Sequence, residues 1–235
     1  MNHLNARIGV YEILASVFYR RNSGQAGEGM EGRLLRRLAG TVMECCSDSA
    51  QCCLPDDLVR EIEELSQIFN DEKEAAESAS RLNVEYTRLF VTDFPSLWAP
   101  PYESYYREGR MMGMAAIDCL SIYEEDGLTL SPGRQLPDHI VTQLEYLLFL
   151  CLAEKKALEE KDADLYKILR EKEQSFYEHH IMTWVLEFCE RIQSYSREAY
   201  YRIMGRFLKN FAVRESMRLK QEELDPFQEV INDVK

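Results

Sequence analysis

The sequence is short of basic residues and histidines and has no long uncharged apolar run. Its 235 residues include 28 lysines and arginines against 41 aspartates and glutamates, so the formal net charge is −13 at pH 7. This charge disfavours nucleic acid and anionic membranes as partners and favours a cationic partner. No stretch approaches the roughly 18 uncharged residues that a membrane-spanning helix needs. We therefore expect a soluble protein with no direct membrane insertion.

Several chemical motifs are also missing. The glycine-rich residues 24–32 lack the GxxxxGK[ST] pattern that holds phosphates, so we expect no nucleotide site of that type. The chain has four histidines. His179 and His180 are adjacent on a helix and point about 100° apart, so they cannot share a metal, and we expect one in the core and one exposed. Residues 1–7 show no export signal, which makes the cytoplasm the expected location.

Cysteine is present but follows no standard metal or disulfide pattern. Four of the seven cysteines form a cluster, namely Cys45, Cys46, Cys52 and Cys53. Two adjacent pairs with five residues between them do not fit the spacing of zinc fingers or ribbons, so we expect reduced thiols there and leave a metal or redox role open. No metal ligand or cofactor is assigned. The others, expected to be small core residues on apolar helical faces, are Cys119, Cys151 and Cys189.

Helical periodicity is what the sequence does show, almost from end to end. Apolar residues recur every three or four positions, and no alternating β pattern competes with them. We therefore predict an all-α fold, a single compact domain of about eight to twelve helices over residues 1–225, followed by an acidic tail, 226–235. The helix that starts at Pro137-Asp138-His139 is apolar over much of its circumference and should lie centrally.

One stretch, residues 93–106, breaks the helical pattern. Pro95, Pro100 and Pro101 remove backbone donors and fix φ, so we predict that no helix runs through it. An ordinary connector would be small and polar, whereas this one is rich in aromatic side chains. These either fill the protein's own core or line a ligand groove, and both roles stay open for different residues. Its large apolar and acidic members are Asp93, Phe94, Leu97, Trp98, Tyr102, Glu103, Tyr105 and Tyr106.

Asp138 and His139 are predicted in the first turn of the central helix. An aspartate there is favoured by the helix dipole and accepts hydrogen bonds from free amides. A charged histidine gains nothing from that dipole. His139 therefore implies neutral hydrogen bonding, a partner in Asp138 or Glu145, or a ligand contact, and we favour the contact. No nucleophile or activated water accompanies these residues at a recognisable spacing, so we do not expect an enzyme.

In chain order, the residues resemble a known family. The shared features are Tyr86-x-x-Leu89-Phe90, the proline and aromatic loop, Pro137-Asp138-His139, and His180-x-x-x-Trp184-x-x-x-Phe188. Over about residues 4–219 they look like the TorD/DmsD/NarJ family of cytoplasmic chaperones for molybdenum-containing redox enzymes. The four-cysteine cluster is not part of that pattern. The resemblance implies an all-α chaperone, monomeric or homodimeric, rather than an enzyme.

The same resemblance implies the partner and its binding site. Members bind the twin-arginine signal peptide or N-terminal segment of a molybdopterin-containing subunit and hold it until the cofactor is inserted. Such a peptide combines two guanidinium groups with an apolar segment, so its receptor should offer carboxylates beside an aromatic groove. Two other functions stay open, a helical adaptor between proteins and a metal-dependent hydrolase using Asp138 and His139. The predicted peptide-binding residues are Phe94, Leu97, Trp98, Pro100, Pro101, Tyr102, Glu103, Ser104, Tyr105, Asp138, His139 and Glu145.

Overall fold

The computed structural model describes residues 2–19, 34, 36–38, 40–41, 56–68, 72–92, 97–131 and 135–221. Within these ranges the chain forms helices joined by loops, and the β-structure is limited to one isolated bridge. The prediction of an all-α fold is confirmed. None of the described helices is long and apolar enough to cross a membrane. The four-cysteine cluster, Asp93, Phe94 and the predicted tail 226–235 lie outside the described residues.

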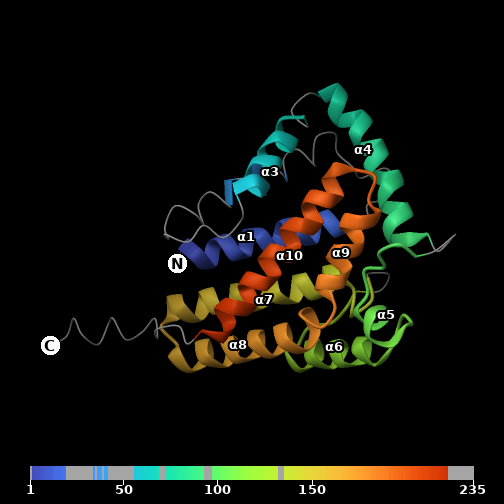
Figure 1. Cartoon of the computed structure of the whole chain (residues 1–235). Coiled ribbons are helices and arrows are strands. Elements are labelled where there is room, and N and C mark those ends of the chain that lie inside the picture. Colours follow the sequence, from blue (N-terminus) through green and yellow to red (C-terminus); the bar gives the residue numbers. More distant parts are fainter. Residues whose placement is uncertain are drawn as a thin grey trace.

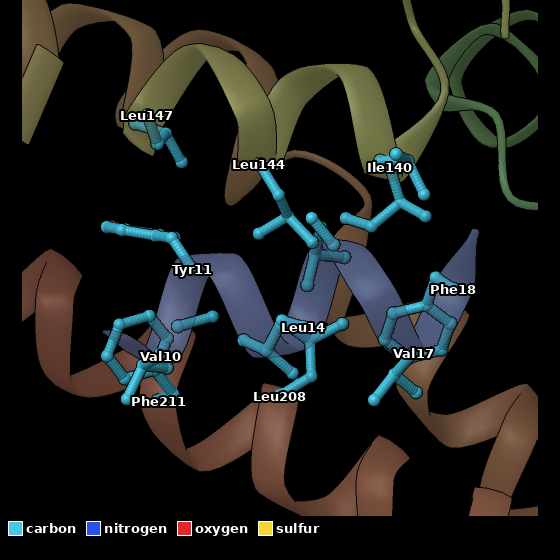
Figure 2. Close-up of a cluster of buried hydrophobic side chains, with 14 of the residues drawn as sticks. Val10, Tyr11, Leu14, Val17, Phe18, Ile140, Leu144, Leu147, Leu208 and Phe211 are labelled. Atoms are coloured by element: carbon cyan, nitrogen blue, oxygen red, sulfur yellow. The ribbon is translucent and has the colours of Figure 1, made fainter. Parts of the chain in front are cut away.

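The first half of the chain contributes a buried helix and a helical arm. Helix α1 (Asn2–Phe18) is followed by α3 (Asp56–Ile68), α4 (Glu72–Tyr86) and the π-helical turn η1 (Thr87–Val91). Helix α1 lies between α7 and α10, as Figure 1 shows and as its contacts confirm. Its side chains fill the space between those two helices (Figure 2), and Tyr11, Leu14 and Phe18 are almost completely buried.

The second half of the chain surrounds the predicted central helix. Its elements are α5 (Glu103–Glu108), α6 (Met114–Glu125), α7 (Ile140–Glu160), α8 (Ala163–Phe176), π-helical η2 (Tyr177–Ile181), α9 (Val185–Tyr195) and α10 (Ala199–Lys220). Helix α7 packs against both α1 and α8. The central position predicted from its apolar circumference is therefore confirmed. Cys119, Cys151 and Cys189 are buried free thiols, as expected.

A buried cluster of charges joins α1 to three other helices. Arg7 donates from Nε to Glu215 at 2.7 Å and from Nη1 to Glu154 at 3.3 Å, and it also pairs with Glu173. Burial and the neighbouring Glu173 charge raise the pKa of Glu154 to about 7. Burial also opposes the ionisation of Glu173, but Arg7 and Arg218 outweigh it and lower the pKa of Glu173 to about 2. Glu154 thus holds its proton at a pH where Glu173 is charged.

The prediction that no helix runs through residues 93–106 is wrong at the C-terminal end of that stretch. Residues 93–106 were expected to exclude a helix, yet the short helix α5 begins at Glu103, inside that stretch. Pro101 is the last proline of this stretch, so each of its amides from Tyr102 onward can donate a hydrogen bond and nothing prevents a helical turn. The helix ends at Gly109, whose φ of 70° is left-handed. The loop character therefore applies only to its described residues before Glu103.

Candidate peptide-binding site

Two segments far apart in the sequence are joined through their backbones at this site. The amide of Ile140 donates to the carbonyl of Pro101 at 2.9 Å, and the amide of Glu103 donates to the carbonyl of Asp138 at 3.0 Å. Between these bonds, Tyr102 and His139 form an isolated antiparallel bridge. The proline and aromatic loop is thereby fixed to the N-terminus of the central helix α7.

The side chain of Asp138 strengthens this junction. Its Oδ2 accepts a hydrogen bond from the backbone amide of Ser104 at 2.9 Å. The N-cap residue of α5, Tyr102, provides no side-chain cap, so Asp138 supplies one from across the chain, where its negative charge also suits the helix dipole. Asp138 was expected to cap its own helix, and the structure shows it serving α5 instead. The residue is fully buried.

His139, not Asp138, is the N-cap of α7. Its Nδ1 accepts a hydrogen bond from the amide of Val141 at 3.1 Å, and its ring lies edge-on to Tyr102 with 5.0 Å between centroids. Burial lowers the pKa of His139 to about 3, so the ring is neutral at physiological pH. Of the roles left open by the sequence, neutral hydrogen bonding is the one that this geometry displays. The ligand contact that we favoured stays a prediction.

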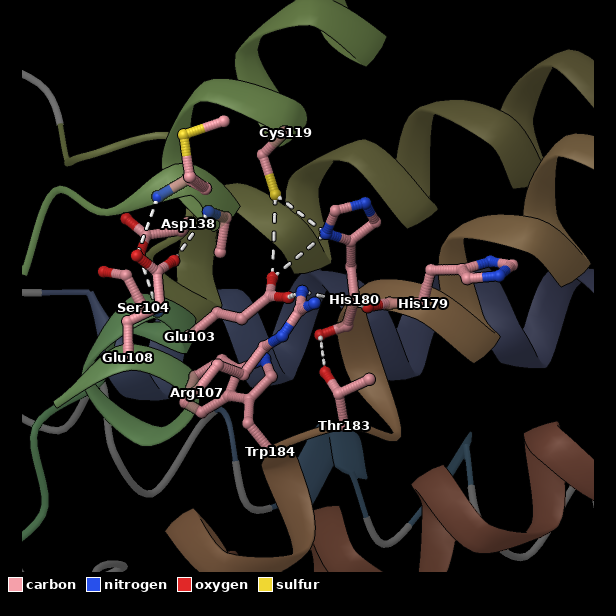
Figure 3. A network of polar contacts seen from close by, with 12 residues as sticks. Glu103, Ser104, Arg107, Glu108, Cys119, Asp138, His179, His180, Thr183 and Trp184 are labelled. Carbon is pink, nitrogen blue, oxygen red and sulfur yellow. Dashed lines mark hydrogen bonds and ion pairs between the residues drawn. The ribbon is translucent and has the colours of Figure 1, made fainter.

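Glu103 is also held inside the fold, at the start of α5. Its Oε1 accepts from Arg107 Nη1 at 2.5 Å, and its Oε2 accepts from Gln143 Nε2 at 2.6 Å. The same Oε2 lies 3.1 Å from Nδ1 of His180 (Figure 3). Glu103 and Asp138 are both fully buried, so neither faces solvent where an incoming arginine would meet it.

Aromatic residues of the loop and of α5 pack onto α9 without being fully covered. Trp98 is half-buried, with its ring 4.8 Å from that of Tyr195 and the guanidinium of Arg88 5.7 Å from its centroid. Tyr105 and Tyr106 are half-buried as well, and Arg191 lies 5.7 and 5.3 Å from their ring centroids. The packing of these rings shows the core role, and their partial exposure leaves the ligand-groove role a prediction.

The structure therefore divides the predicted site into an outer and an inner set. Phe94 lies outside the described residues. The outer set is half-buried and comprises Leu97, Trp98, Tyr102, Tyr105 and Glu145. The inner set is buried and comprises Pro100, Pro101, Glu103, Ser104, Asp138 and His139.

A methionine-rich surface beside the site was missed by the sequence analysis. Met111, Met112, Met114 and Ile117 are each at least half exposed. Glu108, at the end of α5, fixes their loop by accepting from the amides of Met114 and Ala115, both at 2.9 Å. A side chain at Gly113 would collide with the Glu108 carboxylate. The run Met111-Met112-Gly113-Met114 was the available signal, since flexible, polarisable methionines are common on surfaces that accept varied apolar ligands.

The all-α fold is the one that the family resemblance implied, and the structure joins the two segments that carry this resemblance, the proline and aromatic loop and the start of the central helix. A family model described as nitrate reductase delta subunit matches residues 53–190, and the chain belongs to that family. It is 35% identical over 115 residues to a selenate reductase assembly chaperone protein of Thauera selenatis and 30% identical over 115 residues to a chlorate reductase assembly chaperone protein of Ideonella dechloratans. Each of these matches covers 48% of this chain and 58% of the relative.

A longer match reaches a third curated protein. The chain is 24% identical over 208 residues to a chaperone protein TorD of Vibrio cholerae, with 87% of this chain and 88% of that protein covered. This match includes both the loop and the start of the central helix, because it extends over most of the chain. All three relatives carry the word chaperone in their names.

Proposed function

We propose that this chain is an assembly chaperone that binds the N-terminal segment of a molybdopterin-containing oxidoreductase subunit. Where the client carries a twin-arginine signal peptide, that peptide is the segment bound, in the cytoplasm, before cofactor insertion and export. Membership of the family is the observation that carries the proposal. The names of two relatives, which mention the assembly of selenate and chlorate reductases, support an oxidoreductase as the client.

The outer set of the site suits the apolar part of such a peptide. Trp98 is held in place by Tyr195 on one side and by Arg88 near its ring. An aromatic side chain that is already ordered loses little entropy on binding, and partly exposed Trp and Tyr are typical of residues that contribute most to interfaces. Tyr102, at the end of the loop, and Tyr105, on α5, are half-buried as well. We therefore assign retention of the peptide chiefly to these rings.

The acidic contribution differs from the one that the sequence suggested. Asp138 and Glu103 accept internal hydrogen bonds and are fully buried, so we assign them the task of holding the loop on α7. Glu145 is half-buried on α7 and is our candidate for direct contact with arginine. The net charge of −13 would also speed the encounter with a basic segment, since long-range attraction raises association rates.

The test begins with the full-length chain as bait in cells that produce it, followed by identification of the protein that co-purifies. A synthetic peptide of that partner's N-terminal segment is then titrated by calorimetry. Trp98→Ala should weaken binding by about 2 kcal/mol, or roughly 30-fold, with little dependence on salt. Glu145→Gln should weaken it mainly at low ionic strength, because salt screens charge pairs over about 8 to 10 Å. Ile168→Ala, an exposed apolar position on α8, is the matched control and should bind normally.

Other outcomes would redirect the assignment. Equal losses and equal salt slopes for Trp98→Ala and Glu145→Gln in folded variants would contradict the division between an aromatic surface and an acidic contact. A partner that binds only as a folded protein, with no affinity for its own N-terminal peptide, would favour the adaptor. The metal-dependent hydrolase has less support, because Asp138 Oδ2 and His139 Nδ1 each accept a hydrogen bond from a backbone amide. Each would have to break that helix-capping bond in order to bind metal or water.

A further inference from the structure

Three side chains of the types that bind transition metals meet behind the loop. Glu103 comes from the first turn of α5, Cys119 from α6 and His180 from η2, and all three are buried. One donor atom of each, Oε2, Sγ and Nδ1, lies within 4.8 Å of the other two. Figure 3 shows these atoms pointing toward one another from three separate elements.

The triangle formed by these atoms has the dimensions of one face of a tetrahedral metal site. Glu103 Oε2 lies 3.1 Å from His180 Nδ1 and 3.7 Å from Cys119 Sγ, and Sγ lies 3.4 Å from Nδ1. Zinc binds nitrogen and oxygen at about 2.0–2.2 Å and sulfur at about 2.3 Å, so tetrahedral angles place its ligands about 3.3–3.6 Å apart. Only small shifts would bring the three atoms into that arrangement.

We propose that Glu103, Cys119 and His180 bind a single zinc ion, with the fourth ligand supplied by water. Thiolate, imidazole and carboxylate are each ligand types that zinc binds. The two negative ligands balance the charge of the ion, which suits a site with almost no exposure to solvent.

A thiol is a poor residue for this position if hydrogen bonding is its only task. It has one weakly donating proton, yet Cys119 Sγ faces both Glu103 Oε2 and His180 Nδ1. Hydroxyl or amide groups would satisfy these two buried partners better. As a metal ligand, however, the same sulfur would bind the ion strongly once its proton is displaced. Burial raises the pKa of the Cys119 thiol, so the metal-free side chain is protonated, and binding releases that proton to solvent.

The surroundings position the three ligands as the outer groups of metal sites do. Arg107 holds Oε1 of Glu103, which directs Oε2 toward the other two donor atoms. Gln143 donates from Nε2 to that oxygen at 2.6 Å, and its own Oε1 accepts from Trp184 Nε1 at 3.1 Å. Such contacts fix the orientation of ligands and commonly change metal affinity by about 10–100-fold.

The position of His180 adds a second feature. It lies in the π-helical turn η2, and π-helical turns occur frequently at functional sites because they redirect side chains. Its ring stacks on Phe176 with centroids 5.0 Å apart, which fixes the direction of Nδ1. Because the ligands come from three elements, a bound ion would connect α5, α6 and η2 directly beneath the loop that carries Trp98.

The experiment uses the full chain in two forms, the native sequence and a background in which Cys45, Cys46, Cys52 and Cys53 are changed to serine. Each is freed of metal with a chelator and titrated with zinc chloride and, separately, cobalt chloride. In the serine background we expect one equivalent of either metal, a thiolate-to-cobalt charge-transfer band and a higher melting temperature with zinc. Cys119→Ser should lower the affinity by about 100-fold or more and remove that band. Cys189→Ser, a change of another buried free thiol, is the matched control and should retain both.

The proposal is overturned if the serine background binds no zinc, or if Cys119→Ser binds it as tightly as the background does. Should Cys119→Ser fail to fold, the cobalt spectrum of the background decides by itself, because a spectrum without the thiolate band excludes Cys119 as a ligand. His180→Asn provides a further check and should lose metal while the Cys189→Ser control keeps it. No step involves the client peptide, so the result is independent of the proposed function.

Discussion

The buried charge cluster around Arg7 predicts that two neighbouring glutamates respond oppositely to the same substitution. Glu154→Gln imitates a protonated carboxyl group, the form that Glu154 holds below its pKa of about 7. Glu173→Gln removes a carboxylate that is charged at any pH well above about 2 and pairs with both Arg7 and Arg218. We therefore expect Glu154→Gln to be tolerated and Glu173→Gln to be costly.

The magnitudes follow from these pKa values. Folding raises the pKa of Glu154 from 4.5 to about 7, so between these values the folded state holds a proton that the unfolded state has released. The contribution of Glu154 to the free energy of unfolding is therefore largest below pH 4.5, falls as the pH rises and is constant above about 7. The change is on the order of 3 kcal/mol, because each pKa unit corresponds to about 1.4 kcal/mol. Removing one charged member of a buried ion pair typically costs about 3–5 kcal/mol, which is our estimate for Glu173→Gln.

The measurement is urea unfolding of the wild type and both variants at pH 5 and pH 8. Relative to the wild type, Glu154→Gln should be nearly neutral at pH 5 and stabilising at pH 8, where the wild type has lost the Glu154 proton. Glu173→Gln should be destabilised at both values. A larger loss of stability in Glu154→Gln than in Glu173→Gln would contradict these pKa shifts, and so would a difference between Glu154→Gln and wild type that is the same at both pH values.

Two further predictions concern a helix cap and a helix contact. Burial lowers the pKa of His139 from 6.5 to about 3, so its contribution to the free energy of unfolding is full above pH 6.5 and is lost as the pH falls toward 3. Asparagine at this position is a cap that does not titrate. Urea unfolding should therefore show His139→Asn more stable relative to the wild type at pH 4.5 than at pH 7, by about 1 kcal/mol or more. No relative gain would contradict the neutral cap. A Cβ at Gly205 would lie 3.0 Å from Ile192 Cγ2, so thermal melts should show Gly205→Ala destabilised by about 1 kcal/mol despite the helix preference of alanine. A Cβ at Gly40 would meet nothing within 4 Å, so Gly40→Ala should be neutral or stabilising. Equal effects at the two glycines would show that α9 and α10 shift apart to accommodate the added methyl group at little cost.

The all-α class and the central position of α7 were predictable because they depend on local periodicity. A helix presents residues three and four apart on one face, so the spacing of apolar residues indicates which face is buried without reference to any distant part of the chain. The expectation that one of His179 and His180 lies in the core and the other is exposed was correct for the same reason, and the structure shows that His180 is the buried one. The family resemblance likewise depended on short segments in a fixed order.

The roles of polar residues at the site were not predictable in this way. Asp138 caps a helix that begins 35 positions earlier in the chain, and Glu103 meets Cys119 and His180 from different elements. Arg7 pairs with glutamates on three other helices. Hydrogen bonds and ion pairs act over a few ångströms, so their partners depend on how the helices pack.

The sequence alone thus determined that the chain folds as helices, which of them lies at the centre, and which family it resembles. These properties follow from apolar spacing and local motifs, which are written along the chain. The tertiary structure alone decided that Asp138, Glu103 and His139 are internal supports of the loop, with Trp98 and Tyr105 left partly at the surface. The physical reason is that exposure and pairing of a polar group are set by neighbours that only packing brings within contact distance.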